Sequence, residues 1–285
     1  MIRALLLTSR PLSWVNTAYP FAAAYLLATG RVDLPLIVGT VFFLVPYNLA
    51  MYGINDVFDY ESDLRNPRKG GVEGALLDPR WHPLTLWLSG LLALPFVVYL
   101  VLVGGPASWI VLAVSLFAVV AYSAKGLRFK ERPVLDSLTS STHFVSPAAY
   151  GLALAGAPLD LGVAAVLGAF FLWGCASHAF GAVQDIVADR EAGIGSIATV
   201  FGGRATVRIA VVLYLLAAVL LLAAPWPGPL AAVLPLPYAV NALPWWSVAD
   251  ADAESANRGW RRFLWLNFGT GFLVTMLLIG AVLLR

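Results

Sequence analysis

The chain has 285 residues, of which 60% are hydrophobic and 12% carry a charged side chain, and its formal net charge is +2. Soluble domains of this size do not have such a composition, so the sequence predicts an all-α polytopic membrane protein. The single cysteine, Cys175, excludes a disulfide framework and a cysteine-rich metal site.

Apolar stretches long enough to cross a bilayer recur along the chain, since a helical span needs about 20 residues. The first continues past Pro20, so we interpret it as a retained span rather than a cleaved signal. We expect one transmembrane domain over residues 1–285, built as two four-helix halves and a final helix. Its nine expected spans are 13–29, 34–54, 84–103, 107–124, 135–156, 160–181, 205–224, 229–248 and 263–284.

The distribution of Lys and Arg predicts the orientation in the cytoplasmic membrane. With the N-terminus inside, every Lys and Arg lies in a cytoplasmic segment except Arg31 and Arg285. An odd number of spans then places the two termini on opposite faces.

Two acidic clusters, Asn55–Asp63 and Asp185–Asp189, end predicted spans on this cytoplasmic side. In a continuous helix Asp56, Asp59 and Asp63 share one face, and the two aspartates of the second cluster share another. Like charges at these spacings repel, and carboxylates at membrane depth are costly. A hard cation removes the repulsion, and Mg²⁺ usually shares its ligands with substrate phosphates. The clusters therefore predict a Mg²⁺-diphosphate site at the membrane surface.

Two other interpretations remain open for these clusters. Asp56, Asp59 and Asp63 can form a solvated helix end paired with Arg65 and Arg68, although the second cluster in an equivalent position favours a site. A cation-binding transporter would also use paired acids, but near mid-membrane on broken helices rather than beside a basic loop.

A third segment completes a family pattern. Tyr122–Lys130 contains a Tyr-Ser pair followed by Arg128-x-Lys130 in the loop after the fourth span. Together with the acidic clusters and Ser9-Arg10-Pro11, it resembles the UbiA superfamily of intramembrane prenyltransferases over nearly the whole chain. Members of that family often have Pro-Pro where this chain has Lys125-Gly126.

The resemblance implies Mg²⁺-dependent transfer of a prenyl group from an allylic diphosphate to a membrane-dissolved acceptor, with no nucleic-acid partner. It implies diphosphate contacts from Arg128, Lys130 and Asn55, and a Tyr122 ring beside the allylic cation. Tyr122 as an interfacial belt residue, and the two basic residues as topology signals, are the plainer alternatives. The expected catalytic residues are Tyr122, Asp59 and Asp185. The expected metal ligands are Asn55, Asp59 and Asp63 for one ion, Asp185 and Asp189 for the other, and Asp56 directly or through water.

Two stretches, Trp14–Phe21 and Ser177–Thr199, are similar to the lycopene elongase branch of this superfamily. This likeness implies dimethylallyl diphosphate as the donor and lycopene as the acceptor, in the synthesis of fifty-carbon carotenoids. The tertiary cation so formed loses a proton or takes up water. An aromatic quinone precursor, a chlorophyllide or a sugar-phosphate stays open as the acceptor.

Further polar residues lie within the spans. We expect Asn16, Asn48 and Asn267 to form interhelical hydrogen bonds. His178 lies two turns before Asp185, where it can deprotonate an intermediate or simply pack between helices; the alternatives for His143 are similar.

Overall fold

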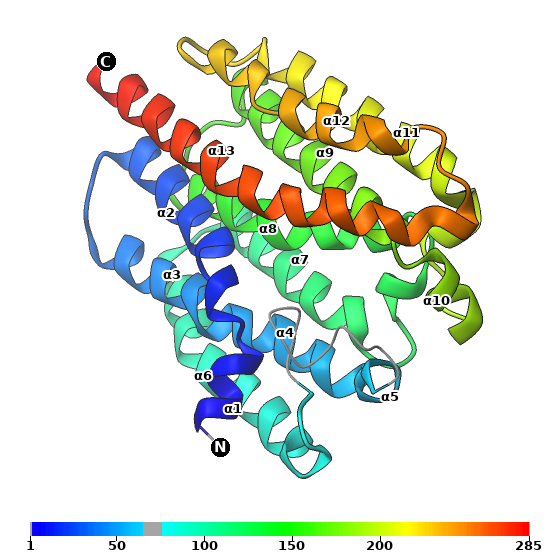
Figure 1. Cartoon of the computed structure of the whole chain (residues 1–285). Coiled ribbons are helices and arrows are strands. Elements are labelled where there is room, and N and C mark those ends of the chain that lie inside the picture. Colours follow the sequence, from blue (N-terminus) through cyan, green and yellow to red (C-terminus); the bar gives the residue numbers. More distant parts are fainter. Residues whose placement is uncertain (1, 65–75, 285) are drawn as a thin grey trace. The chain divides into compact units, whose positions relative to one another are not determined.

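The computed structural model describes residues 2–64 and 76–284, with the backbone alone for residues 2–4, 62 and 63. The described residues form helices throughout, with no strand, which confirms the expected all-α class (Figure 1). Contacts divide the chain into two compact units. Unit 1 comprises residues 1–129 and 143–157, and unit 2 comprises residues 130–142 and 158–285. Whether the chain is one functional domain stays a prediction.

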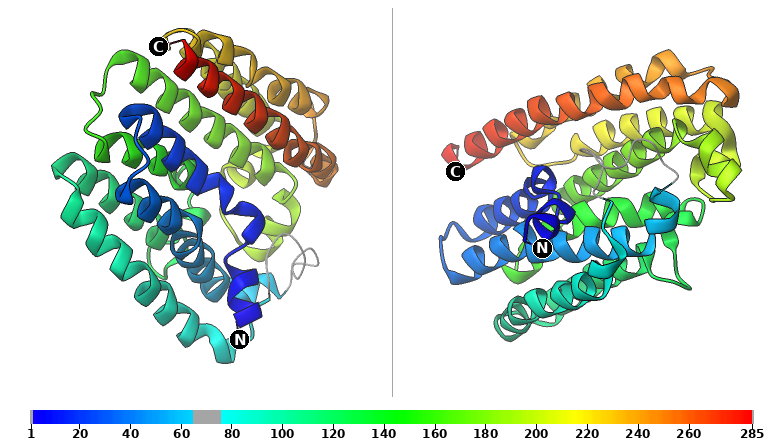
Figure 2. Two further views of the ribbon diagram at one scale, coloured as in Figure 1. Left: turned by 90° about the vertical axis from the view of Figure 1, so that its left-hand side faces the viewer. Right: turned by 60° about the horizontal axis from the view of Figure 1, so that its bottom comes forward.

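Unit 1 is built on the contacts of α2 with α3 and of α4 with α6 (Figure 2). Its centre is a cluster of buried aromatic rings that includes Phe21, Phe43, Tyr47 and Tyr150. Its α-helices are α1 (Ile2–Thr8), α2 (Val15–Thr29), α3 (Leu34–Leu44), α4 (Pro46–Phe58), α5 (Tyr60–Asp63), α6 (His82–Val103), α7 (Pro106–Ser123) and the second part of α8 (Leu135–Leu154), with the 3-10 turns η1 (Pro11–Ser13) and η2 (Pro79–Trp81).

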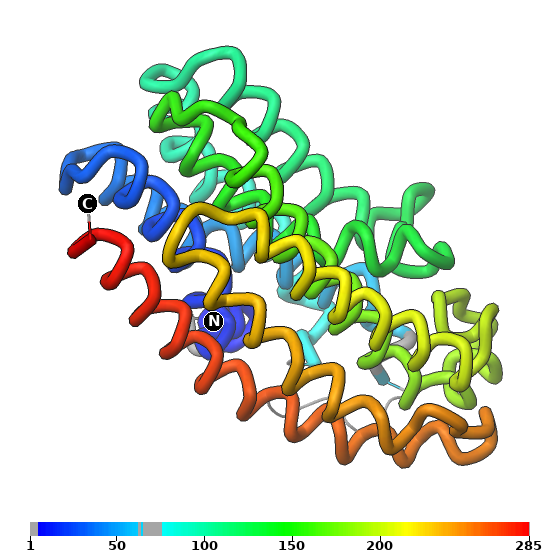
Figure 3. Tube along the Cα trace, turned by 90° about the horizontal axis from the view of Figure 1, so that it is seen from above, coloured from blue at the N-terminus to red at the C-terminus, as the bar shows by residue number. Residues whose placement is uncertain are grey.

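Unit 2 is built on the long contact between α9 and α11, with α12 packed on α11 and α13 (Figure 3). Phe180, Tyr214, Tyr238, Trp245 and Phe263 fill its core. Its α-helices are the first part of α8, α9 (Leu161–Val183), α10 (Ile186–Ala192), α11 (Ile197–Leu221), α12 (Leu236–Ala242) and α13 (Asn257–Leu283), with η4 (Gly228–Val233), η5 (Leu243–Trp245) and η6 (Asp250–Ala256). The short η3 (Phe129–Glu131) crosses the boundary between the units.

Three of the described α-helices, α3, α9 and α11, begin where a side-chain oxygen accepts from a free backbone N–H group. Asp33 accepts from Leu36 N at the start of α3, and Asp160 accepts from Val163 N at the start of α9. Ser196 and Thr199 bond each other's backbone N–H at the start of α11, a reciprocal capping box. These caps fix the ends of helices whose interiors are nearly all apolar.

Six helical stretches of the described chain are long and apolar enough to cross a membrane. They are Leu34–Phe58, Pro79–Val103, Pro106–Ser123, Leu161–Val183, Ile197–Leu221 and Asp250–Leu283. This supports a multi-pass membrane protein, while the count of nine spans stays a prediction. The eighth expected span, 229–248, is not one helix but consists of η4, α12 and η5. Several prolines lie in this stretch. They interrupt a continuous helix, because each one lacks a backbone N–H donor and clashes with the preceding turn.

One side of α6 shows why this composition suits lipid. Trp87, Leu91, Leu94 and Val98 are exposed at spacings of three and four residues, so they form one apolar stripe. The buried side of α6 contacts α4, where the Ser89 hydroxyl donates to Leu49 O at 3.3 Å.

Two of the three expected asparagines join helices. The buried Asn48 amide donates to Thr17 Oγ1 of α2 at 2.7 Å and to Phe43 O of α3 at 2.8 Å. Asn267 of α13 accepts from the Tyr238 hydroxyl of α12 at 2.9 Å. Interhelical hydrogen bonding is thus confirmed for both residues.

Close helix contact in unit 1 predicts an intolerant glycine. A Cβ atom at Gly151 of α8 would lie 2.7 Å from Phe21 O of α2, a backbone atom that no side-chain rotation can move aside. We expect Gly151→Leu to lower the free energy of unfolding by about 1–3 kcal/mol through overpacking. Gly90→Leu in α6 is the matched control, since nothing lies within 4 Å of the added Cβ. Thermal unfolding in detergent measures both, and equal midpoints would contradict the prediction.

Candidate active site

The first acidic cluster lies at a helix break rather than on one continuous helix face. α4 ends at Phe58, and Asp59 caps it with φ −99° and ψ −4° before α5 begins. Asp56 and Asp59 are 1% and 4% exposed, which excludes a solvated helix end for these two residues. The side chain of Asp63, and the pairing expected from Arg65 and Arg68, lie outside the described residues.

Arg10 neutralises Asp56. Its Nη2 donates to Asp56 Oδ1 at 3.0 Å, and its guanidinium lies 4.2 Å from the centre of the Tyr52 ring. Arg10 reaches this position from a left-handed backbone conformation, φ 50°, just before η1. The ion pair balances a carboxylate that would otherwise be costly to bury.

Asn55 is oriented by the end of α7. Its Nδ2 donates to the buried Ser123 hydroxyl at 3.0 Å. This bond uses the donor side of the amide and leaves the carbonyl oxygen, the atom that can ligate a cation, on the other side.

The loop after α7 brings an arginine to the first cluster. Gly126 has φ 92°, which favours glycine and accounts for this residue where Pro-Pro is common in the family. Arg128 also has a positive φ, 42°. From there its Nη1 donates to Phe58 O at 3.4 Å, and its Nη2 lies 3.9 Å from Asp59 Oδ1. The arginine therefore caps the broken end of α4 and faces the acid at the break.

The second acidic cluster has the same backbone conformation at its helix break as the first cluster. α9 ends at Val183, and Asp185 precedes α10 with φ −98° and ψ −3°. The turns that lead into the two breaks differ: Asp59 N donates to Asn55 O, four residues back, at 2.9 Å, whereas Asp185 N donates to Ala182 O, three residues back, at 3.1 Å. The matching breaks support the expected internal duplication, although the two clusters belong to different units.

Arg190 anchors the second cluster within unit 2. It lies 2.7 Å from Asp250 Oδ2 of η6 and donates to Thr199 O of α11 at 2.8 and 3.1 Å. Asp250 in turn accepts from Gly203 N at 2.7 Å, next to the kink of α11 at Gly202, where φ is 78°. The half-buried Asp185 and Asp189 are thus carried on a short helix that is held at its far end.

Two further expected residues lie at the end of α7 and shortly after it. Tyr122 is half-buried at the end of α7, and its ring packs edge-on against His143 of α8, with centroids 5.2 Å apart. Lys130 lies in η3 and belongs to unit 2, whereas Arg128 belongs to unit 1.

The donor chemistry fits a hard divalent cation. Unit 1 offers the amide oxygen of Asn55 and the carboxylates of Asp56 and Asp59, and unit 2 offers those of Asp185 and Asp189. The Arg10 pair occupies one oxygen of Asp56. No three His, Cys, Asp or Glu residues gather as a metal group within residues 2–64 and 76–284.

Sequence reasoning missed three features of these sites. The partner of Asp56 is Arg10, 46 residues away, and the partner of Asn55 is Ser123, 68 residues away. No local sequence pattern predicts either of these pairings. The third is Asp136, a fully buried acid at the start of α8, and the rule that buried acids in membrane helices need a reason would have found it.

Long apolar helices that end in two acidic breaks, one of them faced by an arginine, fit a membrane enzyme that acts on an anionic, phosphate-bearing substrate. This is the class of the intramembrane prenyltransferases. The chain belongs to the UbiA prenyltransferase family, whose model matches residues 17–269.

Two relatives within this family are similar to the chain over nearly its whole length. A lycopene elongase/hydratase of Corynebacterium glutamicum is 55% identical over 279 residues, covering 98% of this chain and 97% of the relative. The C(50) beta-cyclic carotenoids biosynthesis protein LbtBC of Dietzia sp. is 60% identical over 284 residues, covering 99% of this chain. The chain spans about two thirds of that protein's length, 66%.

Solved structures share the fold at low identity. A UbiA homolog from Archaeoglobus fulgidus, bound to GPP and Mg²⁺, has a TM-score of 0.69 at 19% identity, covering 94% of this chain and 99% of that one. The same homolog bound to DMAPP and Mg²⁺ also has a TM-score of 0.69, at 18% identity, with 94% and 98% coverage.

The Arg10–Asp56 pair predicts a measurable coupling energy. Arg10→Met removes an arginine that is hydrogen-bonded to a buried carboxylate, so we expect the free energy of unfolding to fall by about 3 kcal/mol. The double variant Arg10→Met/Asp56→Leu should recover most of this loss, because apolar replacement of both partners removes the unpaired charge. Measuring the unfolding of the two single variants and the double variant in mixed micelles completes the double-mutant cycle.

The exposed Arg80–Asp78 pair provides the control, since its side chains are 73% and 52% exposed. Arg80→Met should change the stability by no more than about 0.5 kcal/mol. Additive effects of the Arg10 and Asp56 substitutions would show that their contact contributes nothing.

Proposed function

We propose that this protein transfers the dimethylallyl group of dimethylallyl diphosphate to a terminal double bond of lycopene, as a step in making fifty-carbon carotenoids. The observation that carries the transfer chemistry is the pair of matching acidic helix breaks at Asp59 and Asp185. The acceptor is supported by the Corynebacterium glutamicum relative, which matches over nearly the full length of both chains.

Mg²⁺ is the proposed metal. Asn55, Asp59 and Asp63 would hold one ion, with Asp56 joining directly or through water, and Asp185 and Asp189 would hold the other. When bound, Mg²⁺ neutralises the diphosphate and so assists its departure. The bond from Asn55 to Ser123 supports this assignment, because it fixes the amide with its oxygen available to a ligand.

The basic loop is the proposed diphosphate clamp. Arg128 can donate two parallel hydrogen bonds to phosphate oxygens, and Lys130 adds a point charge. Two contacts of Arg128, with Phe58 O and with Asp59, are long, at 3.4 and 3.9 Å, so a phosphate oxygen can replace these two at little cost.

Tyr122 is the proposed support for the allylic cation. An aromatic face attracts a cation electrostatically, most strongly where water is excluded. The edge contact with His143 restrains the ring, which favours this role over that of a free interfacial anchor.

The acceptor must approach from the membrane. Extended lycopene is longer than the hydrocarbon core of a bilayer, which is about 30 Å thick. One end would therefore enter laterally from lipid, while the remainder of the polyene stays in the membrane.

The proposed test uses a bacterial host that makes lycopene. The wild type should yield carotenoids heavier by one and by two five-carbon units. Asp59→Ala and Asp185→Ala should each lower the yield by more than about a hundredfold, because even outer-shell partners of a metal can cost that much. Asp160→Ser, which keeps the cap of α9, is the matched acidic control and should retain activity.

Near wild-type turnover in either aspartate variant would overturn the two-cluster site. A host that accumulates only lycopene, while the purified enzyme prenylates an aromatic acid, would overturn the acceptor but not prenyl transfer. A protein that releases no diphosphate and instead transports a cation would overturn both.

The proposed location is the cytoplasmic membrane, with the N-terminus and both acidic clusters inside. The positive charges of the loops around Arg128 and Arg190 support it. A reporter active only outside the cell should be active when fused at Gly105 or after Arg285, and inactive when fused at Gly126. Activity at Gly126, or a cytoplasmic signal after Arg285, would contradict the nine-span topology.

A further inference from the structure

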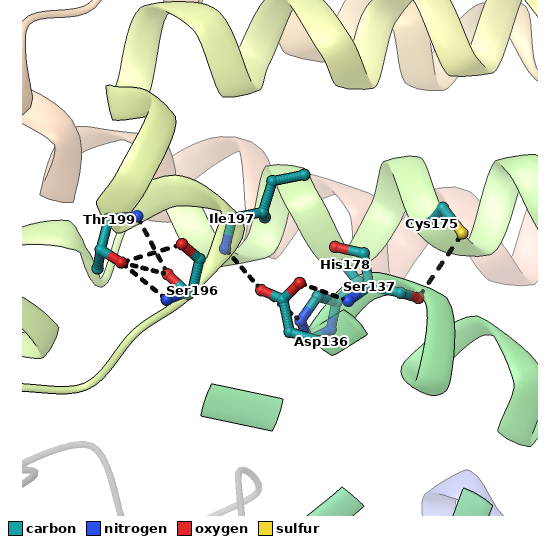
Figure 4. Close-up of polar contacts among 7 residues, drawn as sticks. All are labelled: Asp136, Ser137, Cys175, His178, Ser196, Ile197 and Thr199. Carbon is teal, nitrogen blue, oxygen red and sulfur yellow. Dashed lines mark hydrogen bonds and ion pairs between the residues drawn. The ribbon is translucent and has the colours of Figure 1, made fainter. Parts of the chain in front are cut away.

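A buried carboxylate in unit 2, that of Asp136, has no part in the proposed metal or diphosphate contacts. Figure 4 shows its polar contacts. Asp136 lies in the first turn of α8 and has no exposed surface. Its Oδ1 accepts from Ser137 N at 2.7 Å, and its Oδ2 accepts from Ile197 N, at the start of α11, at 2.8 Å. The positive ends of two helices therefore meet at this acid, but both hydrogen-bond donors are neutral.

The ionisable neighbour of Asp136 is a histidine. His178 Nε2 of α9 lies 3.8 Å from Asp136 Oδ2, and this is the one ion-pair contact of Asp136 in the described chain. Such a distance allows an ion pair but is longer than a hydrogen bond. If the neutral ring carries its proton on Nε2, which faces the carboxylate, the lone pair lies on Nδ1. The His178 side chain keeps 22% of its surface exposed, so the ring is not sealed in the core.

His178 lies in the last part of α9, ahead of the acidic break at Asp185. Five residues separate it from Val183, where the helix ends, and five residues rise about 7.5 Å along the axis. If the break marks the level of the diphosphate, His178 lies deeper along α9, at the level of the hydrocarbon part.

We infer that His178 is the catalytic proton acceptor that ends the reaction and that Asp136 is the residue that positions it. This inference rests on the proposed function. The allylic C–O bond breaks and diphosphate leaves with the electron pair. The π electrons of the acceptor then form the new C–C bond, which leaves a tertiary cation.

His178 Nδ1 takes a proton from a carbon next to that cation, and the C–H electron pair becomes the new double bond. The negative charge of Asp136 balances the imidazolium that results. The proton passes afterwards to water or to the released diphosphate, so atoms and charge balance without a redox partner.

If Asp136 and His178 only held helices together, replacing either residue would weaken the fold without changing the ratio of products. Asp136 joins α8 to α11 through its bond to Ile197 N, and Cys175 Sγ donates to Ser137 O at 3.6 Å beside it. His178 forms no hydrogen bond in this junction among the described residues. Removing its imidazole should therefore change the chemistry more than the fold.

The test measures how products are partitioned. Purified enzyme in vesicles that contain lycopene receives dimethylallyl diphosphate and Mg²⁺, and released diphosphate and each carotenoid are quantified. His178→Gln should lower the unsaturated product per diphosphate released at least about tenfold, with hydrated carotenoid or free prenyl alcohol in its place. Asp136→Asn should shift the ratio in the same direction. Cys175→Ala, one turn away in the same cluster, should leave the ratio unchanged.

Thermal unfolding distinguishes a folding defect from a change in chemistry, because loss of folded protein lowers all products together. A wild-type ratio in His178→Gln overturns the inference and leaves the proposed function standing. A wild type that gives only hydrated product also overturns it. A wild type that prenylates no carotenoid overturns the proposed function and this inference together.

Discussion

The need to balance carboxylates at the ends of apolar helices governs the polar structure of this protein. A charge of this kind is costly to bury unless a counter-charge and hydrogen bonds replace water. The counter-charges come from far along the chain: Arg10 for Asp56 and Arg128 for Asp59. Each pair therefore also fixes a tertiary contact, so that electrostatics and packing specify the same arrangement.

The two acidic clusters solve this problem differently. In unit 1 the acids are buried and arginines face them directly. In unit 2 Asp185 and Asp189 are half-buried, and the nearby arginine, Arg190, is turned away to Asp250 and Thr199. The first cluster thus resembles a preformed, charge-balanced cradle, whereas the second presents acids whose neighbouring arginine is already engaged.

Periodicity and composition were sufficient to predict the all-α fold class and most of the helices, because lipid imposes a long apolar pattern on each span. They also predicted that both acidic clusters lie at the ends of helices. They failed at the helix breaks, since the φ and ψ of Asp59 and Asp185 depend on the partners that satisfy the broken ends, such as Arg128 at Phe58 O. The eighth span was wrong as a single helix for a reason visible in its prolines. The pairing of Asp56 with Arg10 depends on tertiary structure and leaves no trace in local spacing.

Histidine suits the position beside Asp136 better than other polar residues would. Lys or Arg would balance the carboxylate equally well, but it would remain protonated and could not accept a proton at neutral pH. A neutral amide could accept a hydrogen bond but could not carry the positive charge that follows proton transfer. Histidine alone combines a basic lone pair with a charged state that a carboxylate at 3.8 Å stabilises. An acid held by Ser137 N and Ile197 N stays in place whichever form the ring adopts, so the histidine can change its charge without moving the helices that carry it.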